Sequence, residues 1–166
     1  LYTEIPPGTI LDDVFIPMHV AFVGKRVVFQ PSAIAHDQLF SQTGKEFSRK
    51  VRTLTGNYQL LQLAPWLLSP SNPLLFRFIS HKLLRLLIPL LLVLILAASI
   101  LTRGSVYRAF LWLQVLLYAL AVLGVMCPSL KRFKLVAITS TFVLLNLAAA
   151  FAFYNFIAGR NRVWVQ

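Results

Sequence analysis

The chain has 166 residues, 58% of them apolar, and its 16 basic and five acidic side chains give a formal net charge of +11. The apolar share exceeds the roughly 45–50% of soluble domains, so the composition is that of a membrane protein, and a single cysteine excludes disulfide frameworks and cysteine metal clusters. The basic residues are spread along the chain and mostly flank apolar runs, which indicates anchoring at a membrane surface and not nucleic-acid binding.

The amino-terminal part is predicted to contain one helix and one strand. Residues 1–10 read as a loop, interrupted by two prolines and a glycine. Apolar residues then recur at helical spacing over residues 12–22, where Pro17 marks either the start of the helix or a kink, and Gly24 is placed to end it. Residues 25–30, KRVVFQ, are rich in β-branched and aromatic side chains, which predicts a short strand.

Residues 44–63 are predicted to form an amphipathic helix. Its apolar residues are spaced four, three, four and three, which is one helical face: Phe47, Val51, Leu54, Tyr58 and Leu61. Basic residues fall largely off this stripe, and Trp66 follows the helix, so we expect the helix to lie on a membrane surface. Three prolines within residues 64–79 predict a broken interfacial segment and not a further span.

Three later runs have no charged residue: Leu86–Thr102, Ala109–Leu130 and Leu135–Gly159. A bilayer core about 30 Å thick needs about 20 helical residues, so we predict transmembrane helices over about 84–102, 108–129 and 135–158. The amides Gln114 and Asn146 are expected to join helices. The basic residues that flank these spans number six on one side of the membrane and four on the other. This difference predicts a cytoplasmic amino-terminal part and an external carboxy terminus.

The acidic residues all lie within the first 46 positions, so any carboxylate chemistry belongs to this polar amino-terminal part of the chain. The adjacent pair Asp12-Asp13 stands where the loop meets the first helix. One interpretation is helix capping, worth about 0.5–2 kcal/mol, in which a carboxylate accepts first-turn amide hydrogens. The other is catalysis.

The order of residues around this pair resembles a known family. The string TILDDVFIPMHVAFVGKRVVFQPSAIAHD, followed by EFSRKVRTLTGNYQLL and apolar helices, resembles the end of the catalytic domain of membrane-integrated family 2 glycosyltransferases. These include cellulose, chitin, hyaluronan and poly-N-acetylglucosamine synthases. In that family an acidic pair opens a helix, and a Gly-Tyr/Lys-Arg-Val turn and strand and a Pro-x-Ala segment follow. Here Gly24 comes eleven residues after Asp13 and precedes KRVVFQPSAIA, which is the family spacing.

A second string, RKVRTLTG at residues 49–56, is similar to the Gln-x-x-Arg-Trp box of the family. Arg52 falls on the box arginine, Arg49 replaces its glutamine and Thr53 replaces its tryptophan. In the processive synthases this tryptophan contributes to the acceptor-sugar site, so its loss argues against a long-chain processive mechanism. The GNYQ string at residues 56–59 recurs in such relatives, and no role is assigned to it.

The resemblance implies a mainly α membrane protein organised in three regions. Residues 1–43 would be a short α/β remnant of a GT-A catalytic domain, 44–80 an interfacial helical region and 81–166 a region of three transmembrane helices. The implied activity is inverting transfer of a sugar from a nucleotide-sugar donor to a growing glycan or a lipid-linked acceptor. The implied location, among membrane lipids, is the bacterial inner (plasma) membrane, with the catalytic side cytoplasmic.

The resemblance also implies roles for particular residues. Asp13 would be the general base that deprotonates the acceptor hydroxyl, with Asp12 orienting it or capping the helix. Arg52 would stabilise the leaving diphosphate, with Arg49 and Lys50 beside it. Anchoring to lipid headgroups is the favoured role for Lys50.

An enzyme of this type also needs Mg²⁺ or Mn²⁺, held by an Asp-x-Asp motif on a Rossmann-like amino-terminal portion. The 166 residues contain no such motif, and no histidine pair has metal-ligand spacing, so no metal ligand is predicted here. We therefore expect the chain to be the carboxy-terminal part of a longer protein and inactive alone. The competing hypothesis is a non-enzymatic membrane scaffold or a transporter fragment, in which the acidic pair only caps a helix.

Overall fold

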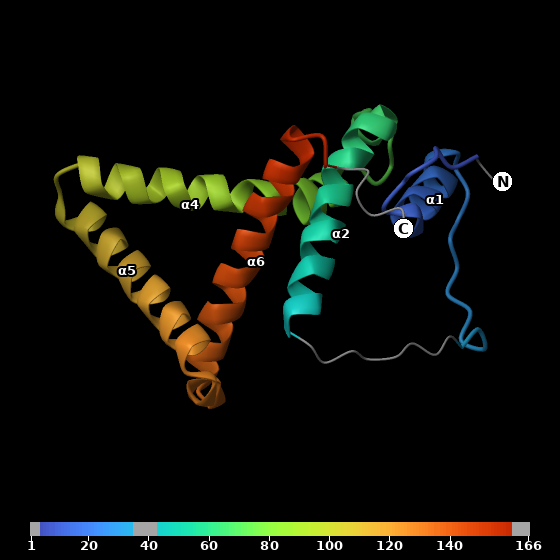
Figure 1. Cartoon of the computed structure of the whole chain (residues 1–166). Coiled ribbons are helices and arrows are strands. Elements are labelled where there is room, and N and C mark those ends of the chain that lie inside the picture. Colours follow the sequence, from blue (N-terminus) through green and yellow to red (C-terminus); the bar gives the residue numbers. More distant parts are fainter. Residues whose placement is uncertain (1–3, 35–42, 161–166) are drawn as a thin grey trace. The chain divides into compact units, whose positions relative to one another are not determined.

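The computed structural model describes residues 4–34 and 43–160, and every regular element in these ranges is a helix (Figure 1). The elements in chain order are α1 (Asp12–Phe22), α2 (Thr43–Leu63), η1 (Pro65–Leu68), α3 (Leu75–Phe78), η2 (Ile79–Leu83), α4 (Leu84–Leu101), α5 (Ser105–Met126), η3 (Pro128–Arg132) and α6 (Lys134–Ile157). Contacts divide the chain into two compact units. Unit 1 comprises the described residues of Leu1–Leu86 and Phe151–Gln166, and unit 2 comprises Leu87–Ala150.

Helix α1 has the predicted bounds and the predicted stop. Gly24 adopts a φ of 75°, in the left-handed region where a glycine carries no Cβ penalty. The N–H of Lys25 donates to the Val20 carbonyl and that of Gly24 to the Ala21 carbonyl, both at 3.0 Å. This pair of bonds is a Schellman ending. The helix runs from Asp12 through Pro17, which excludes a start at the proline.

The predicted strand over residues 25–30 is not formed, and residues 4–34 and 43–160 contain no strand elsewhere. Strand propensity acts only when a neighbouring strand pairs with the backbone and side chains pack against it. Val28 and Phe29 instead stand 85% and 87% exposed. The α/β remnant is therefore not supported, and the described amino-terminal part consists of one helix and irregular segments.

The core of unit 1 joins α1, α2, η1 and α3. Its buried members are Leu11, Phe15, Leu60, Ala64, Leu67 and Phe78. Trp66 of η1 packs on one face of α1, with its ring centroid 6.0 Å from Phe15, 5.6 Å from His19 and 4.9 Å from Phe22. The tryptophan that we expected at a membrane interface therefore packs against the protein's own first helix.

The predicted amphipathic helix is present as α2, and its apolar stripe packs largely against protein. Val51 and Leu54 are buried, with 7% and 4% exposure. Three ring pairs join α2 to the end of α6, at centroid distances of 6.1, 5.6 and 5.3 Å: Phe47–Phe151, Tyr58–Phe153 and Tyr58–Phe156. Contact between α2 and a membrane surface stays a prediction.

Three helical stretches are long and apolar enough to cross a membrane: Leu75–Leu101, Ser105–Met126 and Lys134–Ile157. The second and third agree with the predicted spans to within a few residues. The first begins earlier than predicted, because the π-helical η2 joins α3 to α4 without a break. Proline interrupts the preceding segment only up to residue 73, after which the chain is helical.

Unit 2 is held together by close helix contacts. A Cβ on Gly124 of α5 would lie 2.7 Å from Val136 Cγ1 of α6 and would collide with Ser140 Oγ, so only glycine permits this approach. Gln114 joins α5 to α4 by donating from Nε2 to the Leu92 carbonyl at 3.1 Å, as predicted. Asn146 instead donates to the Phe142 carbonyl of its own helix, at 2.8 Å.

Candidate functional site

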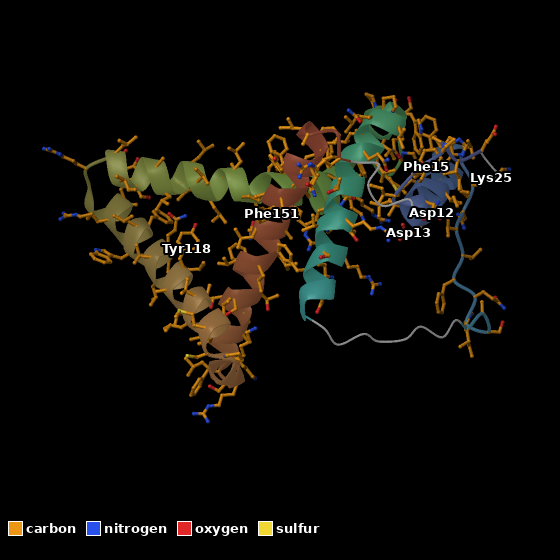
Figure 2. The ribbon with its side chains drawn as sticks, viewed as in Figure 1. Asp12, Asp13, Phe15, Lys25, Tyr118 and Phe151 are labelled. Carbon is orange, nitrogen blue, oxygen red and sulfur yellow. The ribbon has the colours of Figure 1, made fainter. Side chains whose placement is uncertain are left out.

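The acidic pair stands in the first turn of α1 (Figure 2). Its two carboxylates have different surroundings. Leu11 at the N-cap position forms no side-chain cap. The Asp12 carboxylate accepts the backbone N–H of Asp13 at 3.0 Å. Within the part of the chain that the structure describes, the exposed Asp13 carboxylate has no hydrogen-bond or ion-pair partner. Asp12 therefore satisfies a first-turn amide, and Asp13 is available to a ligand.

The segment that leads into α1 meets α2 at a glycine. A Cβ on Gly56 would lie 2.6 Å from Leu11 Cγ and 3.0 Å from Ile10 Cγ2, so the contact requires the absence of a side chain. Glycine within a helix costs about 0.5–1 kcal/mol relative to alanine, and this close approach gives it a physical reason. Ile10 and Leu11, which contact Gly56, immediately precede the acidic pair.

One turn further along α2, the Gln59 carboxamide binds the same entry segment. Its Nε2 donates to the Gly8 carbonyl, and its Oε1 accepts the N–H of Ile10, both at 2.9 Å. The backbone that leads into α1 is therefore tied to α2 by both ends of one side chain.

The GNYQ string, for which the sequence predicted no role, is where these contacts originate. Successive residues of a helix point about 100° apart, so four in a row cover all its sides. Gly56 and Gln59 meet the segment before α1, and the Tyr58 hydroxyl donates to the Leu86 carbonyl at 3.4 Å. Asn57 is 4% exposed, and its carboxamide oxygen is buried without a partner. A glycine followed by Asn57 and Gln59 inside a predicted helix is the sequence signal that such contacts leave, and it does not identify their partners.

The basic candidates Arg49, Lys50 and Arg52 are all exposed on α2. Arg52 precedes Gly56 by four residues, about one helical turn or 5.4 Å along the axis. Asp13 follows Leu11 by two residues, so Asp13 and Arg52 each stand within about one helical turn of the contact between Leu11 and Gly56. No ion pair joins them in the described structure. Both side chains are exposed.

The described residues offer no group of three or more histidine, cysteine or acidic side chains that could hold a metal ion. His19 is stacked on Phe15, with ring centroids 6.4 Å apart and planes 9° apart. His36 and Asp37 lie outside the described residues.

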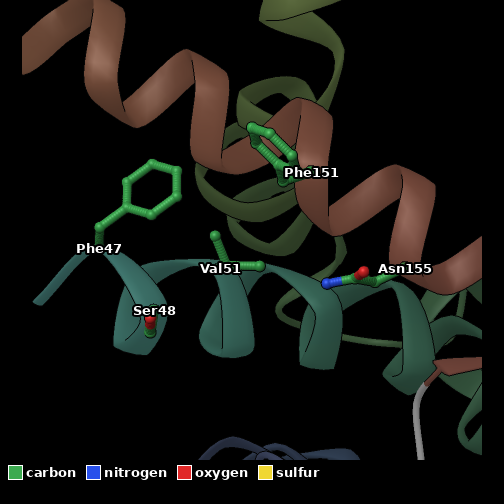
Figure 3. Close-up of a pocket in the computed structure, with 5 residues that line it drawn as sticks. All are labelled: Phe47, Ser48, Val51, Phe151 and Asn155. Atoms are coloured by element: carbon green, nitrogen blue, oxygen red, sulfur yellow. The ribbon is translucent and has the colours of Figure 1, made fainter. Parts of the chain in front are cut away.

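A small pocket of about 170 Å³ lies elsewhere in unit 1 (Figure 3). Its lining comes from α2 and the end of α6: Phe47, Ser48, Val51, Phe151 and Asn155. None of the candidate acidic or basic residues lines it, so the pocket is distinct from the candidate site. Comparisons with protein-family models, curated proteins and solved structures found no match.

Proposed function

We propose that this chain is the carboxy-terminal part of a membrane-integrated inverting glycosyltransferase, which moves a sugar from a nucleotide-sugar donor to a growing glycan or a lipid-linked acceptor. One observation carries the proposal. The two segments whose residue order resembles that family, around Asp13 and around Arg52, meet at the contact between Leu11 and Gly56. Charged residues of opposite sign, exposed within about one helical turn of such a contact, suit a site that binds a polar substrate.

Asp13 would act as the general base. Its carboxylate accepts the proton of the acceptor hydroxyl while that oxygen attacks the anomeric carbon of the donor sugar. The bond from the anomeric carbon to the diphosphate oxygen breaks on the opposite side, and the configuration inverts. A positioned base contributes about 10²–10⁴ in rate. The exposed, unpartnered carboxylate supports this role for Asp13 over Asp12, whose oxygen already accepts an amide hydrogen.

Arg52 would stabilise the departing nucleoside diphosphate. Negative charge grows on the leaving group in the transition state, and a fixed guanidinium close to it lowers the barrier. Arg49 adds positive potential on the same helix, and Lys50 would bind anionic lipid headgroups. The described residues do not provide a site for Mg²⁺ or Mn²⁺, so the proposal places that ion on residues outside this chain, and neither role depends on it.

The three apolar helices support a membrane location. The proposal places the protein in a bacterial inner membrane, with the acidic pair on the cytoplasmic side, where nucleotide sugars are made.

The test uses the full-length protein in detergent or native membranes. Asp13→Asn should lower sugar transfer by about 10²–10⁴ while binding of the nucleotide sugar changes little. Asp12→Asn is the matched control, because an amide oxygen can still accept the Asp13 N–H, and it should retain most of the activity. If Asp13→Asn transfers sugar at the wild-type rate, the assignment of the base is wrong. The non-enzymatic scaffold hypothesis predicts no transfer by the wild-type protein.

A further inference from the structure

The Gln59 side chain makes the polar connection between α2 and the segment before α1. Its carboxamide carries one donating and one accepting end, and both are used at 2.9 Å on backbone groups two residues apart, at Gly8 and Ile10. These partners lie 51 and 49 residues from Gln59 in the sequence. Such a two-point contact fixes the direction of the bound segment as well as its distance.

The start of α1 has no other side-chain hydrogen bond that fixes it to α2 among the described residues. The N-cap residue, Leu11, provides no cap, and the Asp12 carboxylate binds within its own turn. The Thr9 hydroxyl donates to the Pro6 carbonyl at 2.7 Å, which shapes the turn but stays within it. The position of the acidic pair relative to α2 therefore depends on the apolar packing of Leu11 and Phe15 and, for its polar contacts, on Gln59.

The other end of α1 is held differently. Phe22 and His19 pack on Trp66 through their rings, and Trp66 also reaches Phe15. Leu11 and Phe15 anchor the first turn in the apolar core of unit 1. The Gln59 contact adds a directional, hydrogen-bonded restraint at the end that bears Asp13.

We propose that Gln59 is a positioning residue for Asp13. This inference rests on the proposed function, in which the Asp13 carboxylate must reach the acceptor hydroxyl. Displacement of a catalytic group by about 1 Å can cost about 10²-fold in rate, so loss of the two hydrogen bonds lowers turnover without removing any group that touches substrate.

The first measurement compares Gln59→Met with Gln62→Met in the full-length protein. Methionine keeps the length of the side chain and removes both hydrogen bonds. Gln62 is exposed on the same helix, three residues further on, which makes it a matched control. Gln59→Met should lower kcat by about tenfold to a hundredfold with KM for the nucleotide sugar changed by less than about twofold, and Gln62→Met should change neither. Wild-type kcat in Gln59→Met would overturn the positioning role.

The second measurement uses the pH dependence of Gln59→Glu. A protonated carboxyl has one donor and one acceptor, as the amide has, whereas a carboxylate has no donor for the Gly8 carbonyl. An ordinary glutamic acid has a pKa of about 4.3, so the kcat of the variant relative to wild type should rise as pH falls from about 8 toward 5. Gln59→Met has no ionisable group, so its kcat relative to wild type should not depend on pH. If the relative kcat of Gln59→Glu is also independent of pH, the proposal is contradicted.

A third measurement does not depend on catalysis. Backbone amides of residues 12–16 should exchange hydrogen faster in Gln59→Met than in Gln62→Met, because the first turn of α1 opens more often. If Asp13→Asn is fully active, the proposed function is wrong, and the exchange data still test the contact between Gln59 and the segment before α1. If Asp13→Asn is inactive while Gln59→Met exchanges faster and keeps full kcat, only the positioning role falls.

Discussion

The two units each contain a glutamine that reaches across to another segment, and the two glutamines are used differently. In unit 1, Gln59 uses its donor and its acceptor on the segment before α1. In unit 2, Gln114 donates to the Leu92 carbonyl at 3.1 Å, but its Oε1 is buried without a partner. A fully paired amide specifies one geometry, whereas a half-paired one adds little to the packing around it. Polar contacts thus fix positions in unit 1, where the candidate chemistry lies.

The units also share a close contact at a helical glycine. Gly56 of α2 admits the Leu11 side chain of the segment before α1, and Gly124 of α5 admits Ser140 and Val136 of α6. In lipid, helix association depends on van der Waals packing and interhelical hydrogen bonds, and small residues let the helix backbones approach closely. Glycine therefore permits a close contact beside the candidate site in one unit and a close contact between two apolar helices in the other.

The largest expected effect comes from Gly56→Leu. A Cβ alone would lie 2.6 Å from Leu11 Cγ, so the larger side chain should separate α1 from α2 and destabilise unit 1 by about 3 kcal/mol. Trp66 fluorescence during urea unfolding in detergent reports on unit 1, in a background with Trp112 and Trp164 replaced by phenylalanine. Gly56→Ala combined with Leu11→Ala is the control, and its loss should be smaller than the sum of the losses in the two single variants, because each single variant disturbs the same contact. An unchanged midpoint in Gly56→Leu would contradict the close contact at Gly56.

A smaller effect separates the two glutamines. Gln59→Met removes two hydrogen bonds at a half-buried site and should cost about 1–2 kcal/mol in the unfolding of unit 1. Gln114→Met removes the bond to the Leu92 carbonyl, a long 3.5 Å bond to the Tyr118 hydroxyl and the unpaired oxygen, so it should change stability by less than about 1 kcal/mol. Each variant is measured by unfolding in the same detergent. Equal losses would show that the comparison between the units is wrong.

The smallest effect depends on pH. Burial raises the pKa of the Tyr58 phenol above its ordinary value of 10.0. Above about pH 10 the unfolded chain releases this proton first, so the contribution of neutral Tyr58 is complete below that pH and is lost as pH rises through the folded pKa. The Trp66 unfolding midpoint should therefore fall more steeply above about pH 10 in wild type than in Tyr58→Phe. Identical slopes would show that ionisation of Tyr58 is not linked to folding.

The helices could be predicted because their signals are local. Apolar spacing gave α1 and α2 almost to the residue, and runs without charge gave the three apolar helices. The strand over residues 25–30 failed because pairing depends on a partner that the local sequence does not contain.

The candidate site was predictable only in part. The order of residues in the sequence was enough to single out the acidic pair and Arg52. Which of the two carboxylates accepts a backbone hydrogen bond depends on where the helix begins, and it begins at Asp12. Gln59 could not be predicted because its partners are backbone groups about 50 residues away, and backbone groups carry no signature in the sequence.

Tyr58 contacts two apolar helices that are far apart in the sequence. Its hydroxyl is 3.4 Å from the Leu86 carbonyl, directly after Arg85, and its ring is 5.6 Å from that of Phe153. Leu86 is the twelfth residue of the helical stretch that begins at Leu75, so this contact lies about 16 Å along the stretch and not at its start. Phe153 lies four residues before the end of α6. Tyr58 therefore joins these two helices, and a single substitution at Tyr58 would loosen both of them at once.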